Sequence, residues 1–301
     1  MILCCGEALI DMLPRETAAG ESAFAPHAGG SVFNTAVALG RLDAPVQFFS
    51  GLSSDLFGDV LRAQLAASKV DSSPAAISDR PTTLAFVKLT DGHASYAFYD
   101  ENTAGRMLSA DDLPNTEASA LFFGGISLVV EPCGAAYEAM MLREAPNRLT
   151  MIDPNIRPSF VTDEATYRTR LTRMMGAADI IKTSDEDLEW IVGNTDADAL
   201  LASTGAQVIL LTRGGDGVSI VTASGTYDVA AEKAEVVDTV GAGDTFSAGF
   251  MAQLHKSGHL SKDGIKQAGE ADLRAAAAFG AKVAAITVSR AGANPPWASE
   301  L

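Results

Sequence analysis

Short apolar runs alternate with longer segments of helical periodicity along most of this 301-residue chain. Runs rich in Val, Ile, Leu and Phe predict buried strands, and helices between them predict crossover connections. The alternation therefore indicates an α/β fold with a doubly wound, mainly parallel sheet that helices cover on both faces. We expect strands at 1–5, 46–50, 120–124, 149–152, 178–182, 207–212 and 217–222, and helices at 31–42, 56–69, 134–145, 164–176, 185–192, 196–203, 243–257 and 270–286.

Polar or glycine residues directly follow several of the expected strands. Gly124, Asp153, Lys182 and Thr212 each come after or at the end of an apolar run. In an open α/β sheet, ligands bind beyond the carboxyl ends of the strands. We therefore expect these residues to lie along one ligand-binding edge of the sheet.

Residues 82–99 depart from the alternation. Two runs with strand character flank Asp91-Gly92, a dipeptide typical of hairpin turns, and no helix separates them. With residues near 11–27, this hairpin is expected to form a small sheet outside the main one. No linker rich in Pro, Gly or Ser divides the chain. We therefore predict one domain, 1–301, with segments of about 11–27 and 82–101 inserted.

A turn of small residues leads into an amphipathic helix in the C-terminal part of the chain. Gly241, Ala242 and Gly243 precede Asp244, and apolar residues then recur at helical spacing. Unpaired N–H groups at a helix N-terminus, together with the helix dipole, favour a bound anion such as phosphate. A carboxylate at this place suits a general base that accepts the proton of a hydroxyl during phosphoryl transfer. An acidic helix N-cap is the simpler alternative.

Two segments near the N-terminus carry groups that could hold a sugar. Asp11, just past the first apolar run, can accept hydrogen bonds from two neighbouring hydroxyls. The pair Gly29-Gly30 opens a helix and lets the backbone approach a ligand closely. Asn34 lies one turn into that helix and offers both a donor and an acceptor, although an amide on the helix surface is an equal alternative.

Residues 238–250, which include Asp-Thr-x-Gly-Ala-Gly-Asp-Thr-Phe, resemble the C-terminal signature of the ribokinase-like (PfkB) sugar kinases. The resemblance implies a ribokinase-like fold with a small β-sheet lid. It also implies transfer of the ATP γ-phosphoryl group to a primary sugar hydroxyl, with Asp244 as the base. The N–H groups of Gly241, Ala242 and Gly243 would stabilise the transferring group, while Asp11, Gly30 and Asn34 would hold the sugar.

The resemblance extends to further site residues. Arg157, between two prolines, could donate to substrate oxygens, and Phe98 ends the hairpin on the sugar side. A glycine-containing loop after the 207–212 strand resembles the family's nucleotide-binding loop. The residues that would bind the nucleotide are Lys182, Thr212, Gly214, Gly217 and Gly243.

Two acids are candidate metal ligands. Many family members have Asn-x-x-Glu where this chain has Ser184-x-x-Asp187. Asp187 could hold magnesium through water, but Ser184 as a plain helix N-cap explains the same residues equally well. Asp238, with carbonyl groups of residues 284–293, could hold a monovalent cation in the family manner.

Segments 6–14, 98–108 and 153–157 look like those of the bacterial fructokinases within the family, which implies fructose as substrate and fructose 6-phosphate as product. A 2-keto-3-deoxygluconate kinase or another PfkB-type sugar kinase is the nearest alternative, because Arg157 could face an acidic substrate. A non-catalytic sugar-binding regulator conflicts with the intact Asp244 and glycine turn. A nicotinamide-dependent oxidoreductase would need a Gly-x-Gly-x-x-Gly after the first strand, which is absent.

Composition limits the partners. The chain is 47% hydrophobic with a net charge of −16, which argues for a sizeable core and against nonspecific binding of nucleic acid or anionic membranes. Three cysteines without metal spacing, and no signal peptide or long apolar stretch, predict buried thiols and a cytoplasmic location. The family resemblance implies ATP and Mg²⁺, with K⁺ as a further candidate, and an apolar lid edge would favour a homodimer.

Overall fold

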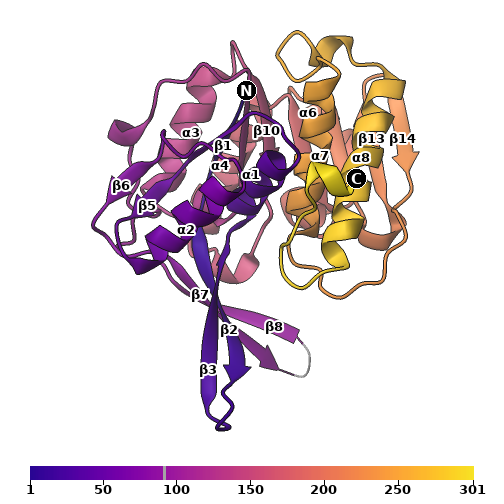
Figure 1. The fold of residues 1–301 in the computed structure, drawn as a ribbon. Helices are drawn as coiled ribbons and strands as arrows, with labels where there is room; N and C mark the ends of the chain where they lie inside the picture. Colours follow the sequence, from indigo (N-terminus) through magenta and orange to yellow (C-terminus); the bar gives the residue numbers. More distant parts are fainter. Residues whose placement is uncertain (91–92) are drawn as a thin grey trace.

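The computed structural model describes residues 1–90 and 93–301 and contains one large sheet between two helical layers, with a smaller sheet projecting from it (Figure 1). The large sheet has the strand order β14-β13-β12-β11-β10-β9-β1-β4. Pairings from β4 through β12 are parallel, whereas β12–β13 and β13–β14 are antiparallel. The strands are β1 (Ile2–Cys5), β4 (Val46–Phe49), β9 (Ala120–Gly124), β10 (Leu149–Asp153), β11 (Ile180–Ser184), β12 (Val208–Thr212), β13 (Val218–Thr222) and β14 (Gly225–Val229).

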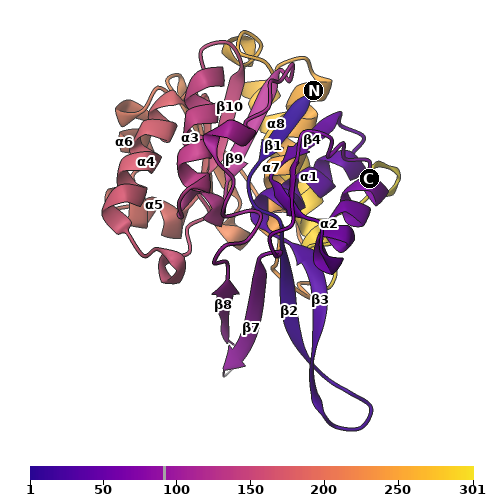
Figure 2. The same cartoon turned by 90° about the vertical axis from the view of Figure 1, so that its left-hand side faces the viewer.

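Alternate residues of the buried strands pack into two separate cores. In β1, Ile2 and Cys4 face one core, and Leu3 and Cys5 face the other. Helices α1 (Ser31–Arg41), α2 (Leu56–Ala67), α7 (Ala242–Lys256) and α8 (Glu270–Val288) cover the first face. Helices α3 (Cys133–Glu144), α4 (Glu164–Ala177), α5 (Asp185–Val192) and α6 (Ala197–Ser203) cover the second (Figure 2). The predicted doubly wound, mainly parallel fold is confirmed.

Each strand and helix expected from periodicity is present in the structure, and one strand is shifted along the sequence in an informative way. The strand predicted at 178–182 spans Ile180–Ser184, so Lys182 lies in the middle of β11 rather than at its end. A lysine is tolerated there because its ammonium group is paired with Asp153. The short strands β5 (Gly51–Ser53) and β6 (Ala76–Ser78), and the edge strand β14, were not predicted because they lack a clear apolar run.

The smaller sheet, called the lid sheet from here on, has the strand order β3-β2-β7-β8. It consists of β2 (Leu9–Glu16), β3 (Ser22–Gly29), β7 (Leu84–Thr90) and β8 (His93–Tyr99), and it extends from the main body in both views (Figures 1 and 2). The predicted turn at Asp91-Gly92 lies outside the described residues. The division into one domain with two inserted segments stays a prediction.

Two further expectations concern the chemical setting of the fold. Cys4, Cys5 and Cys133 are buried free thiols, as expected. Within residues 1–90 and 93–301, no helix combines the length and apolar character needed to cross a membrane.

Candidate active site

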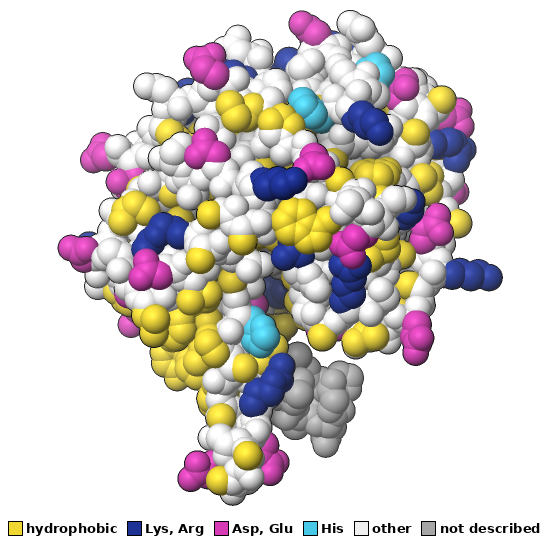
Figure 3. Space-filling model, viewed as in Figure 1, with side chains coloured by type: hydrophobic (Ala, Val, Ile, Leu, Met, Phe, Trp, Pro, Cys, Tyr) yellow, Lys and Arg dark blue, Asp and Glu magenta, His cyan; other side chains and the backbone are white. Residues whose placement is uncertain are grey.

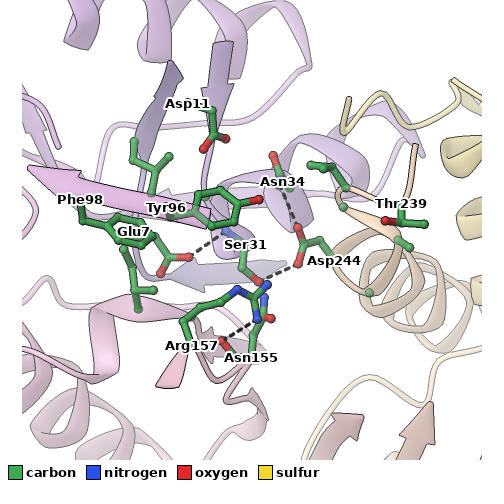
Figure 4. A pocket seen from close by; sticks show the side chains of 18 of the residues that line it. Glu7, Asp11, Ser31, Asn34, Tyr96, Phe98, Asn155, Arg157, Thr239 and Asp244 are labelled. Atoms are coloured by element: carbon green, nitrogen blue, oxygen red, sulfur yellow. Dashed lines mark hydrogen bonds between the residues drawn. The ribbon is translucent and has the colours of Figure 1, made fainter. Parts of the chain in front are cut away.

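Two cavities meet at the N-terminus of α7. The first, of about 290 Å³, is lined by polar residues from the lid sheet, α1 and the loop after β10 (Figure 4). The second, of about 460 Å³, lies between the loop after β12 and helix α8. Thr239, Ala242 and Gly243 line both cavities. A group bound at this helix terminus would therefore be accessible from both sides.

The glycine turn that starts α7 has the geometry of an anion site. Gly241 has a φ of 76°, a left-handed conformation that favours glycine, and an added Cβ would stand 2.6 Å from the Cβ of Ala293. Among the described residues, the N–H groups of Gly241 and Gly243 find no hydrogen-bond partner. The N–H of Ala242 instead donates to the carbonyl of Thr239 at 3.3 Å. In this conformation two of the three N–H groups expected to face a phosphoryl group are free to do so.

Asp244 lies in the first turn of α7 and is buried between α7 and α1. Its Oδ1 accepts a hydrogen bond from Ser31 Oγ at 2.7 Å, and its Oδ2 accepts one from Asn34 Nδ2 at 2.9 Å (Figure 4). Burial raises the pKa of Asp244, and the hydrogen bonds from Asn34 and Ser31 oppose that rise. Desolvation outweighs these hydrogen bonds, so the pKa of Asp244 is raised above its usual value.

The residues predicted to hold the sugar all line the first cavity. These residues are Asp11, Gly30, Asn34, Phe98 and Arg157. The Asn34 side chain is buried against Asp244, so it is not a surface amide.

The glycine pair makes room for two acids. A Cβ on Gly29 would overlap the carboxylate of Asp11, and one on Gly30, whose φ is 107°, would stand 3.0 Å from the carbonyl oxygen of Glu7. Burial, followed by the nearby charge of Asp244, raises the pKa of Asp11 to about 6.

Lys182 stands beside the glycine turn and is buried. Its Nζ lies 2.9 Å from Asp153 Oδ2 and 3.0 Å from the place a Cβ would take on Gly243. Burial lowers the pKa of Lys182, but attraction to Asp153 and Asp187 prevails, so the pKa is raised and the side chain is charged. Lys182 was predicted to bind the nucleotide, but it lines the first cavity and not the second, so it approaches the glycine turn from the sugar side.

The remaining nucleotide-side residues line the second cavity. Thr212 ends β12, and Gly214 and Gly217 have positive φ values of 50° and 94° in the loop that follows. A Cβ on Gly217 would overlap the carbonyl oxygen of Val229, so only glycine fits that place. The opposite wall is apolar and comes from Ala281, Ala284, Ala285 and Val288 of α8. A flat, apolar base fits such a wall, with phosphates directed towards α7.

The two candidate metal ligands are engaged in backbone contacts. The Ser184 side chain accepts from the N–H of Asp187 at 3.0 Å, so the N-cap interpretation describes the observed geometry. Asp187 Oδ1 accepts from the N–H of Ile156 at 3.0 Å, and this residue lines neither cavity. Both carboxylate oxygens of Asp238 accept backbone N–H groups, from Val240 and Gly292. Over residues 1–90 and 93–301, no cluster of His, Cys, Asp or Glu suits a metal ion.

Several cavity residues were not among the predicted site residues. Glu7, Ser31, Tyr96, Asn155 and Thr239 line the first cavity, and Figure 4 shows their side chains around it. An acid inside an apolar segment was a usable signal for Glu7, and strand periodicity relates Tyr96 to Phe98. Asn155 has a φ of 44°, which no sequence pattern announced. Ser31 gave no local signal, since its partner Asp244 is 213 residues away.

A buried carboxylate beside a helix N-terminus with free N–H groups, at the place where a polar cavity meets an apolar one, is typical of a phosphotransferase site. Sequence comparison agrees with this class. A family model described as pfkB family carbohydrate kinase matches residues 1–300. The chain therefore belongs to the pfkB family of carbohydrate kinases.

Several relatives resemble the chain along most of its length. It is 52% identical to a fructokinase of Rhizobium leguminosarum bv. trifolii over 279 residues, which cover 91% of this chain and 86% of that protein. It is 32% identical to fructokinase-1 of Zea mays, across 100% of this chain and 95% of the relative. A crystal structure of fructokinase with bound ATP from Xylella fastidiosa has a TM-score of 0.88 at 29% identity, covering 97% of this chain and 93% of the other.

Proposed function

We propose that this chain is an ATP-dependent fructokinase that phosphorylates the primary hydroxyl of fructose to give fructose 6-phosphate. The observation that carries the proposal is the position of Asp244, which lines the first cavity at the helix terminus where the second cavity begins, beside the free N–H groups of Gly241 and Gly243. The 52% identity to a bacterial fructokinase supports fructose, and the likeness to a fructokinase with bound ATP supports the nucleotide.

On the sugar side, Asp11 accepts hydrogen bonds from hydroxyls, Asn34 and Arg157 donate to sugar oxygens, and Phe98 closes the cavity with an apolar surface. Asp244 orients the primary hydroxyl and accepts its proton. The hydroxyl oxygen forms a bond to the γ-phosphorus as the bond from that phosphorus to the bridging oxygen of ADP breaks. A base with a raised pKa accepts this proton more readily than an unperturbed aspartate would.

On the phosphate side, the N–H groups of Gly241 and Gly243 and the ammonium group of Lys182 stabilise charge on the transferring group. Ala242 joins them if its N–H turns away from Thr239. Thr212, Gly214 and Gly217 border the nucleotide.

We propose that Mg²⁺ enters with ATP, held by the phosphates and water as this ion usually is. The backbone contacts of Asp187 limit it to an indirect role. The backbone contacts of Asp238 suit a residue that supports the loop beside a K⁺ site, in which carbonyl groups would be the ligands.

An acidic sugar is the second candidate substrate. Arg157 and Lys182 both line the first cavity and could face a carboxylate, as a 2-keto-3-deoxygluconate kinase requires.

The test is ATP-dependent ADP release with fructose, 2-keto-3-deoxygluconate, ribose, glucose and adenosine. Turnover highest with fructose supports the proposal. A preference for 2-keto-3-deoxygluconate would change the assigned substrate and leave the proposed mechanism unchanged. Failure on all five, with sugar binding intact, supports a non-catalytic regulator.

We also propose a homodimer in the cytoplasm. Phe24 and Tyr99 of the lid sheet are 47% and 64% exposed, and both rings contact Phe86 on the same sheet face. Figure 3 shows hydrophobic side chains gathered where the lid sheet meets the body. A second copy covering this face would remove it from water. Three buried free thiols are in keeping with a reducing compartment.

A further inference from the structure

Glu7 is a buried carboxylate in the sugar-side cavity that the proposed reaction does not use. It lies in the loop between β1 and β2 and is 8% exposed. Its Oε1 accepts the N–H of Ser31 at 2.8 Å, at the start of α1, and its Oε2 accepts the N–H of Ser127 at 3.4 Å. The carboxylate thus satisfies an N-terminal N–H group of α1, where the helix dipole favours negative charge.

The backbone around Glu7 is shaped to receive this carboxylate. Gly125 has a φ of 70°, and a Cβ there would overlap both Glu7 oxygens. Gly30 packs against the carbonyl and side chain of Glu7 from the other direction. Two glycines with positive φ therefore enclose one acid. Any larger residue at either place would displace the carboxylate from its two N–H donors.

The helix that Glu7 holds carries both side-chain donors to the carboxylate of Asp244 and a third donor to its backbone carbonyl. Ser31 Oγ and Asn34 Nδ2 donate to its two carboxylate oxygens, and Thr35 Oγ1 donates to its backbone carbonyl at 3.2 Å. The position of the Asp244 carboxylate thus depends on the position of the first turn of α1. The contacts form a continuous path from Glu7 through Ser31 to Asp244, all within the region drawn in Figure 4.

We propose that Glu7 is a positioning residue for catalysis, which fixes the first turn of α1 so that Ser31 orients the Asp244 carboxylate. This inference rests on the proposed function of Asp244 as the base. Glu7 acts through the N–H of Ser31 and takes no proton from the substrate. Ser31 orients one oxygen of the base, and Asn34 orients the other.

The test compares Glu7→Gln with the control Glu138→Gln. Glu138 has the same exposure of 8% but lies on α3 in an ion pair with Arg173, away from both cavities. The two N–H groups donate to different oxygens of Glu7, and in glutamine one of these positions becomes an NH₂ group, which cannot accept. We expect Glu7→Gln to lower kcat for fructose about 10- to 100-fold, the scale of a small misplacement in an active site, with KM for ATP unchanged. Glu138→Gln should lower only the melting temperature.

The Ser31→Ala variant provides a measurement, the pH dependence of kcat, that would not change if Ser31 and Glu7 only stabilised the fold. It removes a donor that lowers the pKa of Asp244, so that pKa should rise. The base must be deprotonated, so the acid limb of the kcat–pH profile should shift to higher pH. In the Ser31→Ala background, Glu7→Gln should cost less than in the wild type, because the two act along one path.

Three results would overturn this role. The first is a Glu7→Gln variant with the kcat of the wild type. The second is a loss of activity in Glu7→Gln and Glu138→Gln that is proportional to the fall in melting temperature in both variants. The third is an unshifted pH profile with full activity in Ser31→Ala, which decides the matter alone if Glu7→Gln does not fold. Absence of turnover in the wild type with every sugar would instead refute the proposed function.

Discussion

The side chains that line the first cavity, on the sugar side, carry more negative charge than positive charge. Glu7, Asp11 and Asp244 line it together, and burial raises the pKa of each. Lys182 and Arg157 line the same cavity and offset part of this charge. The fold thus holds carboxylates whose ionised forms are costly to bury, which is expected where acids serve a ligand rather than stability.

Asp11→Asn should stabilise the protein at neutral pH and weaken sugar binding. The pKa of Asp11 is about 6 in the fold against a reference value of 3.8, so ionisation opposes folding above pH 6 and has no effect well below 3.8. Removing the charge should raise the free energy of unfolding at pH 7.5 by up to about 3 kcal/mol, reduced by solvent in the cavity, and less at pH 4.5. Fructose affinity should fall about 10-fold with the lost acceptor.

Urea unfolding at the two pH values, with calorimetric titration of fructose, measures both effects. Equal stability changes at pH 7.5 and 4.5 would show that the carboxylate is not perturbed by the fold. Unchanged fructose affinity would remove Asp11 from the sugar site.

At this scale the sequence pointed to the residues to which we assign the chemistry, but not to the residues that contact and position them. Asp244 was recognisable because its glycine turn and helix are contiguous in sequence. The contact between Ser31 and Asp244 joins positions 213 residues apart, and one sequence contains no information on such pairs. The location of Lys182 within β11 depended on its partner Asp153, which lies on a neighbouring strand.

Among the helices and strands, α7 begins with a left-handed backbone conformation at Gly241, at the place where we propose that the phosphoryl group binds. Gly241→Ala would place a Cβ 2.6 Å from Ala293 and force an L-residue to a φ of 76°. Gly193→Ala is a matched control, since Gly193 has a φ of 77° at the end of α5 with nothing within 4 Å of its Cβ position. Both variants should lose about 1–2 kcal/mol of stability from the backbone alone.

Only Gly241→Ala should also lose activity, about 100-fold in kcat, because in the proposed mechanism its turn positions the N–H groups that stabilise the transferring phosphoryl group. Melting temperature and steady-state kinetics of the two variants separate the effects. Equal activity in both variants would mean that the turn has no catalytic part.

Most helices and strands could be predicted from the sequence because each is determined by a pattern of neighbouring residues. Buried parallel strands appear as continuous apolar runs, and the helices have clear periodicity and caps such as Asp55 on α2 and Asp163 on α4. Strand β14 was missed because it is a half-exposed edge strand with a mixed sequence, Gly225–Val229. The pairing of β2 with β7 is a long-range contact, and the sequence could suggest only that these segments leave the main sheet.

The whole molecule presents an apolar lid-sheet face to solvent. If this face forms the dimer interface, Phe24→Asp should shift the chain to a monomer, since a charge would be buried against the partner. Leu142→Asp is the control, because Leu142 is 40% exposed on α3, away from the lid sheet.

Light scattering after size exclusion gives the mass of each variant. A monomeric wild type, or a Phe24→Asp dimer as stable as the wild-type dimer, would argue against this interface.

The central claim is that Asp244 accepts the proton of the fructose hydroxyl, and the most direct measurement is the turnover of Asp244→Asn alongside calorimetric binding of fructose. Asparagine keeps the size of the side chain and can still contact Ser31 and Asn34, but it cannot act as a base. The account predicts a kcat reduced by about two to four orders of magnitude with fructose binding retained. Turnover near that of the wild type would contradict it.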